Sequence, residues 1–269
     1  MENLLNEIHQ AIADESLVLP TLPDVAMRVR EAVASDDVTA KKLSDIVAQD
    51  PAMTARLLQV ANSPLYRGAV PFENLQSAIM RMGFGTVQSL VTSLAMQQLF
   101  QPRKQMLAQM MREIWEQSVS VAAMARALVA FAPRLNPELA MLAGLIHQIG
   151  ALPLLMYAEE RTDSLEEEPF RELVRELHPL VGGLIARAWE LPEPVQPVPM
   201  HYVDFTRQID GEADYVDLVQ VAFLQNGGEA GVPLSEVTAY GRLGLNADTE
   251  ELEAEEVRET AEQARQALA

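Results

Sequence analysis

Apolar residues recur in this sequence at intervals of three and four, in short segments separated by proline, glycine and capping residues. Leu75, Ala78, Ile79 and Met82 follow the spacing i, i+3, i+4, i+7, and Gly83 comes directly after them. This spacing places apolar side chains on one face of an α-helix, whereas a strand needs strict alternation. Such alternation is scarce, and only 5% of the residues are aromatic. The sequence therefore predicts an all-α fold.

The first hundred residues contain signals for five short helices. Asp50 followed by Pro51 is typical of an N-cap and a first helical position, and Pro64 ends the same segment. Apolar stripes are expected over 25–33, 43–47, 53–61, 75–82 and 87–95. Short connections between short amphipathic helices favour a compact bundle. We assign residues 1–100 to this N-terminal helical bundle.

A second helical part is expected over residues 101–225, after a polar stretch at 101–105. Its predicted helices cover about 106–131, a segment that begins at Asn136-Pro137 and includes Ile146, and about 179–189.

Residues 226–269 are expected to form a loop and an acidic C-terminal helix. From Asp248 onward the chain has eight acidic residues and two arginines, so we interpret this segment as a solvated terminal helix rather than a protein-binding tail. The whole chain has a formal net charge of −19 and no local cluster of basic residues. Because binding to nucleic acid depends on basic residues that neutralise phosphates, a nucleic-acid partner is disfavoured.

Several chemistries lack the residues they need. The chain has no cysteine, which excludes disulfides, thiolate zinc sites and cysteine nucleophiles. It also lacks the HExxH zinc motif, the GxxxxGK[ST] phosphate loop and the GxSxG serine motif. It has no uninterrupted apolar run of about 18 residues, and its start is unlike a secretory signal. We expect a cytoplasmic protein without a membrane partner.

His147, His178 and His201 are the main candidates for chemistry. A metal site needs several imidazoles or carboxylates that converge, and histidines from separate segments can meet in a fold. A lone histidine within an apolar helix, as His147 is expected to be, is more often a core residue whose hydrogen bonds are satisfied than a metal ligand. The spacing alone does not show whether the three histidines converge.

Five segments, in order, carry a resemblance to a known family. They are LPTLPDVAMRV, DIVAQDPAMTARLLQVANSPLY, SAIMRMGFGTVQSL, AGLIHQIGALPLL and HPLVGGLIARAWELPEPV. Over about residues 17–225 the chain resembles the HDOD domain, the HD-related output domain of bacterial signalling proteins. The resemblance implies an N-terminal helical bundle packed on a helical domain similar to the metal-dependent HD phosphohydrolases.

The resemblance also shows where this chain departs from active HD enzymes. Their His-Asp pair of metal ligands corresponds here to His147-Gln148, and glutamine brings no negative charge to hold a hard cation. A lysine that many relatives carry after the glycine corresponds to Ala151. An upstream histidine corresponds to Gln117.

Two further family positions lie downstream. A double histidine of related phosphodiesterases corresponds to His201-Tyr202, and a final carboxylate corresponds to Phe223. We interpret the following residues as the remnant of an HD-type site: His147, Gln148, His178 and His201. The prediction is that they hold no metal and that the chain has no catalytic residue and no cofactor.

The expected function is that of a non-catalytic signal-transduction module that acts by protein–protein interaction, with a protein partner of unknown identity. Two alternatives stay open at this point. One is a residual metal-dependent phosphohydrolase that uses the three histidines. The other is a module that binds a nucleotide second messenger without turnover, which the net charge of −19 disfavours unless arginines converge.

Overall fold

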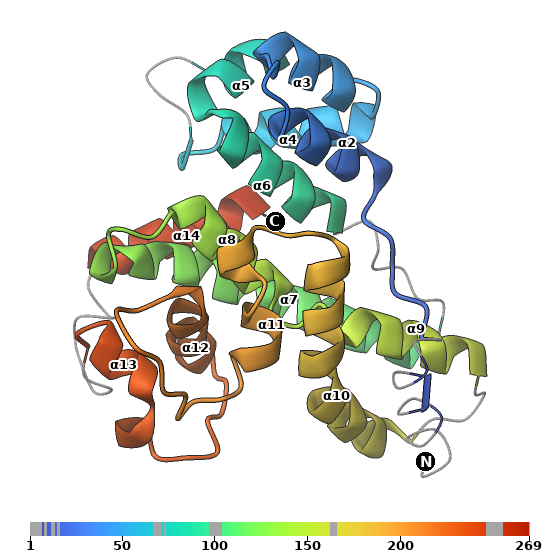
Figure 1. Ribbon diagram of the computed structural model, residues 1–269, viewed down its shortest axis with the longest axis vertical. Coiled ribbons are helices and arrows are strands. Elements are labelled where there is room, and N and C mark those ends of the chain that lie inside the picture. Colours follow the sequence, from blue (N-terminus) through green and yellow to red (C-terminus); the bar gives the residue numbers. More distant parts are fainter. Residues whose placement is uncertain are drawn as a thin grey trace.

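The protein is built from α-helices and short 3-10 helices (Figure 1). The computed structural model describes residues 7, 10–11, 14, 17–66, 71–72, 74–96, 104–161, 166–245 and 255–268. Within these ranges there is no β-strand. The predicted all-α fold is confirmed.

The N-terminal helices lie together at one end of the molecule (Figure 1). They are α2 (Asp24–Val33), α3 (Ala40–Val47), α4 (Pro51–Ala61), α5 (Leu75–Met82) and α6 (Phe84–Met96). The Asp50 side chain accepts a hydrogen bond of 3.0 Å from the backbone N–H of Met53, as its predicted capping role requires. Gly83 separates α5 from α6 with φ of 85°, a value that glycine adopts readily. The five predicted helices are confirmed.

The remaining helices form the larger part of the molecule. They are α7 (Gln105–Ala127), η2 (Leu128–Phe131), α8 (Pro137–Ile146), α9 (Ala151–Arg161), α10 (Glu167–Ala188), η3 (Glu193–Val195), α11 (Val198–His201), α12 (Tyr215–Gln225), η4 (Leu234–Glu236), α13 (Thr238–Arg242) and α14 (Glu255–Leu268). The long helix α7 is central and packs against α8, α12 and α14.

The start of α10 differs from the prediction. The sequence pattern places a helix start near Pro179, but α10 already begins at Glu167 and Pro179 lies inside it. Proline has no N–H to donate, so it cannot make the helical bond to the carbonyl of Arg175. A proline inside a helix and one at its first position look alike in a sequence, and the packing of α10 decides between them here.

The apolar segment around His147 is two helices rather than one. α8 ends at Ile146, His147 is its C-cap, and a turn over 147–150 leads into α9. The expectation that His147 and Gln148 sit within a helix is therefore wrong. Residues 137–160 are long and apolar enough to cross a membrane by length and composition, but 83% of that window is buried inside the protein, as in a core helix.

The C-terminal helix α14 is packed against the rest of the protein on one side. α14 packs along α7 and also contacts α4, and it buries Val257, Ala264 and Leu268. Acidic residues cover its other face, which is why its composition suggested full solvation. The expectation of a solvated terminal helix is corrected to an amphipathic helix that is packed on one side.

The two groups of helices share one hydrophobic core. Its buried members include Leu57 of α4, Val91 of α6, Leu142 of α8 and Val219 of α12. α6 connects the groups because it packs against both α2 and α8. The expected boundary at residues 100–101 lies outside the described residues, so the division into 1–100, 101–225 and 226–269 stays an interpretation.

Candidate functional site

A close approach of two backbones brings His147 and His178 together. The turn that carries His147 packs against α10 through Gly150, where a Cβ atom would lie 2.0 Å from the carbonyl oxygen of His178 and 2.3 Å from the backbone nitrogen of Gly182. Only glycine fits such a contact. The apolar stretch of the sequence therefore breaks into two helices at the point where its turn must touch α10.

His147 is completely buried at the end of α8. Its Nδ1 lies 2.6 Å from the carbonyl oxygen of Gly144, so Nδ1 carries the hydrogen and donates it. Burial disfavours the charged imidazolium and lowers the pKa of His147 to about 3. The ring is then neutral, and its Nε2 is a buried acceptor without a hydrogen-bond partner.

His178 lies inside α10 and is 5% exposed. Its Nδ1 lies 2.8 Å from the carbonyl oxygen of Val174. Its Nε2 lies 2.7 Å from the hydroxyl oxygen of Tyr202. Because Nδ1 donates to a carbonyl, Nε2 accepts from Tyr202. Burial lowers the pKa of His178 to about 4.

Aromatic rings close the space between the two histidines. Tyr202 is 2% exposed, and its ring meets that of His147 edge to face, with centroids 4.8 Å apart at 86°. Phe223 of α12 packs against Tyr202 at 5.4 Å and against His147 at 6.0 Å. Burial raises the pKa of Tyr202, so its hydroxyl keeps its proton and stays a donor.

Two glutamines complete the site. The Nε2 of Gln148 donates a hydrogen bond of 2.8 Å to the Oε1 of Gln117 on α7. Both glutamines occupy positions where the resemblance expects metal ligands. Sequence reasoning did not predict their pairing, although two self-complementary amides at two ligand positions are the signal that could have suggested it.

The structure separates His201 from the other residues expected at the site. His201 is the last residue of α11, and its side chain is exposed. The next residue, Tyr202, turns into the core instead. Pro197 is the N-cap of α11 and Pro199 lies in its first turn, where proline is tolerated. The structure thus brings together His147, Gln148 and His178 and leaves His201 outside.

The donor set does not fit the divalent metal that the HD resemblance implies. Hydrolytic cations are held by carboxylates together with imidazoles, but here two amides and two aromatic side chains stand in ligand positions. One imidazole Nε2 is already engaged by Tyr202. Among the described residues, no group of three or more histidine, cysteine, aspartate or glutamate side chains is placed to hold a metal.

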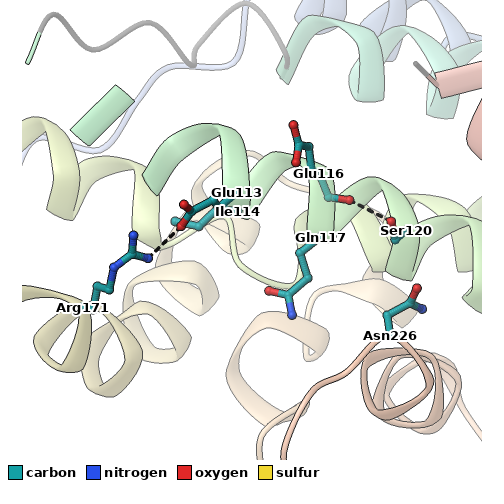
Figure 2. A pocket seen from close by; sticks show the side chains of 7 residues that line it. All are labelled: Glu113, Ile114, Glu116, Gln117, Ser120, Arg171 and Asn226. Atoms are coloured by element: carbon teal, nitrogen blue, oxygen red, sulfur yellow. Dashed lines mark hydrogen bonds and ion pairs between the residues drawn. The ribbon is translucent and has the colours of Figure 1, made fainter. Parts of the chain in front are cut away.

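A polar pocket of about 470 Å³ opens beside Gln117 (Figure 2). It is lined by Glu113, Ile114, Glu116, Gln117, Ser120, Arg171 and Asn226. Arg171 pairs with Glu113 and with Glu167, each at 2.8 Å. Its charge is therefore already matched by carboxylates, and the pocket offers little attraction to an anion.

Solved structures of other proteins share this architecture. A crystal structure from Shewanella amazonensis SB2B, described as a candidate metal-dependent phosphohydrolase, is 33% identical with a TM-score of 0.90, covering 100% of this chain and 99% of that one. An HDOD domain protein of unknown function from Geobacter sulfurreducens is 23% identical with a TM-score of 0.68, covering 99% and 96%.

This chain matches only part of the length of a curated relative. An uncharacterized protein of Treponema pallidum (strain Nichols) is 23% identical over 200 residues, which are 69% of this chain and 37% of that protein. The family model of the HDOD domain matches residues 19–202. This match covers more than half of the chain and includes the segments from which the resemblance was identified, so the protein belongs to the HDOD domain family.

Proposed function

We propose that this protein is a non-catalytic regulatory module of bacterial signal transduction that acts in the cytoplasm by binding another protein. The observation that carries the proposal is the closed site between α8 and α10. There the hydroxyl of Tyr202 bonds to His178, and its ring, with that of Phe223, packs against His147. Membership of the HDOD family, a degenerate relative of the HD enzymes, supports the same function.

The chemistry of HD hydrolysis gives the physical reason. A metal-bound hydroxide attacks the phosphorus, and the metal also stabilises the charge that develops on the phosphate oxygens. Gln148 supplies no charge to hold such a metal, and Ala151, which is 1% exposed, supplies no cation for the phosphate. The missing carboxylate and the missing cation would both stabilise the transition state of hydrolysis. We therefore expect their absence to abolish turnover rather than to change its rate slightly.

Residual hydrolysis is the second candidate, because the Shewanella amazonensis protein with 33% identity is described as a candidate metal-dependent phosphohydrolase. The test compares the wild type with His147→Ala in the presence of Mn²⁺ or Mg²⁺. The substrates are bis-p-nitrophenyl phosphate, cyclic dinucleotides and nucleoside triphosphates. We expect background rates for both proteins. Turnover by the wild type that His147→Ala abolishes would replace the proposal with the enzyme function.

Protein binding is tested separately with the full chain as bait in the native cell. A captured protein is then purified and titrated against wild type and against His147→Ala of verified helicity. We expect saturable one-to-one binding to both proteins, because the proposed interaction does not use the site chemically. The proposal fails if no purified candidate binds the full chain, or if a cyclic dinucleotide binds tightly in calorimetry and no protein does.

A further inference from the structure

We infer that Tyr202 occupies the place of a divalent cation between His147 and His178, and that changing Gln148 and Tyr202 into ligating side chains is enough to create a metal site here. The inference follows from the disagreement between the implied metal and the residues present. It concerns the donor set of the chain and does not depend on the protein partner.

The two histidines share a hydrogen-bond arrangement that is common among metal ligands. In each ring Nδ1 is held by a backbone carbonyl, that of Gly144 for His147 at 2.6 Å and that of Val174 for His178 at 2.8 Å. Ligating histidines are fixed in this way, with the second nitrogen free to face the ion. Each ring is therefore fixed in the tautomer that a metal ligand requires, with Nε2 as the acceptor.

Tyr202 provides what a cation would provide. Its hydroxyl donates hydrogen to the Nε2 of His178 at 2.7 Å, so a partial positive charge meets the lone pair that a metal would take. Its ring fills the adjoining space, 4.8 Å from the ring of His147. The Nε2 of His147 is left buried with no partner, and this unsatisfied acceptor is what remains of the second imidazole ligand.

Gln148 ties this arrangement to α7. Its Nε2 donates a hydrogen bond of 2.8 Å to the Oε1 of Gln117, so two neutral amides are paired at positions where the resemblance expects metal ligands. An aspartate at position 148 would supply the missing carboxylate, and a histidine at 202 would supply an imidazole in place of the larger phenol. Together with His147 and His178 they make four nitrogen and oxygen donors, the number that a tetrahedral cation needs.

The experiment titrates Co²⁺ into the full-length Gln148→Asp/Tyr202→His double variant, because the visible absorption of Co²⁺ reports its coordination. We expect one equivalent to bind, with a dissociation constant at least about tenfold lower than for the wild type. Adding His147→Ala to the double variant should abolish this binding. Adding His201→Gln is the matched control and should leave it unchanged, because the His201 side chain is exposed outside the site.

Two results would overturn the inference. One is wild-type binding of Co²⁺ that is as tight as that of the double variant and requires His147. The other is a double variant with native helical content that binds no more tightly than the wild type. Neither result depends on turnover or on a protein partner, so the proposed function stands or falls separately.

A milder variant covers the case in which the double variant does not fold. Tyr202→Phe removes only the hydroxyl, and two-dimensional ¹⁵N spectra of the histidine rings at pH 7 report the hydrogen bond at Nε2 of His178. We expect this ¹⁵N resonance to shift while those of His201 stay in place. An unchanged His178 resonance would show that the Tyr202 hydroxyl does not donate to Nε2 of His178, and it would contradict the inference that Tyr202 occupies the cation position.

Discussion

At the scale of single residues, the buried histidines make stability depend on pH. Burial lowers the pKa of His147 to about 3 and that of His178 to about 4, whereas an unfolded histidine titrates near 6.5. Above pH 6.5 both states hold neutral rings and stability is complete. Below it the unfolded chain takes up protons that the native state refuses, so the free energy of unfolding falls by about 1.4 kcal/mol per pH unit for each ring.

The loss therefore spans the window from about pH 6.5 down to the two native pKa values. Urea unfolding at pH 7.5 and pH 5.5 measures it, and we expect a decrease of about 2–3 kcal/mol from these two rings. A ring resonance of His147 or His178 that titrates between pH 6 and 7 in the folded protein would contradict the prediction.

Asp217 is a second residue on which the fold depends. It is fully buried in α12 and accepts from Nη2 of Arg242 at 2.6 Å, from Nη2 of Arg207 at 3.0 Å and from the backbone N–H of Asp214 at 3.0 Å. Asp217→Asn keeps the shape but removes the carboxylate that Arg207 and Arg242 share, while Arg207 keeps its pair with Asp214. We expect a cost of about 3–5 kcal/mol in urea unfolding.

The matched control is Asp45→Asn. Asp45 pairs with Lys41 at 2.6 Å, but both side chains are exposed, so solvent screens the pair. Its loss should change the free energy of unfolding by less than about 1 kcal/mol. Equal costs for the two substitutions would show that burial does not strengthen the Asp217 network.

At the scale of elements, Gly150 sets how closely the 147–150 turn approaches α10. In Gly150→Ala the new methyl group would lie 2.0 Å from the carbonyl of His178, and both contacting atoms belong to backbones. One element must then move, and we expect a loss of about 1–3 kcal/mol. Gly85→Ala in α6 is the control, because its Cβ meets nothing within 4 Å. Gly85→Ala should leave the free energy of unfolding unchanged or raise it by up to about 1 kcal/mol. A similar loss of stability in both variants would contradict the close approach at Gly150.

Local signals predicted most elements, and tertiary packing decided the others. Asp50-Pro51 and Asn136-Pro137 mark helix starts because the side chains of Asp50 and Asn136 accept hydrogen bonds from the first turn of the helix that follows each of them. The end of α8 at Ile146 has no such local signal, since the apolar pattern continues into α9. The break lies next to the close approach of Gly150 to α10, a contact that only the fold creates.

The same distinction applies to the site. The motif segments identified His147, Gln148 and His178, because ligand positions are recognisable from their neighbours in sequence. They could not show that Tyr202 rather than His201 turns inward, because adjacent residues at the end of a short helix differ only in the direction they face. Nor could they show the bond between Gln148 and Gln117, whose positions are 31 residues apart.

At the scale of the whole molecule, a buried polar cluster joins the N-terminal helices to the rest. Glu138 of α8 is 7% exposed and accepts from the hydroxyl of Tyr66, which follows α4, and from Nη2 of Arg126 at 3.2 Å. The guanidinium of Arg126 also lies over the Tyr66 ring, 5.7 Å from its centroid. Burial and the charge of Glu138 raise the pKa of Tyr66, so its hydroxyl stays a donor.

This cluster should make the two helix groups unfold together. Glu138→Gln leaves the charge of Arg126 without its counter-ion and should cost about 3–5 kcal/mol, while Tyr66→Phe removes one hydrogen bond and should cost about 1–2 kcal/mol. Because the two side chains are in contact, their combined effect should differ from the sum by at least about 0.5 kcal/mol. Tyr66→Phe combined with Glu172→Gln, an exposed residue of α10, should be additive. Additive effects of Glu138→Gln and Tyr66→Phe would mean that the shared apolar core of α6 and α8, and not this cluster, holds the two helix groups together.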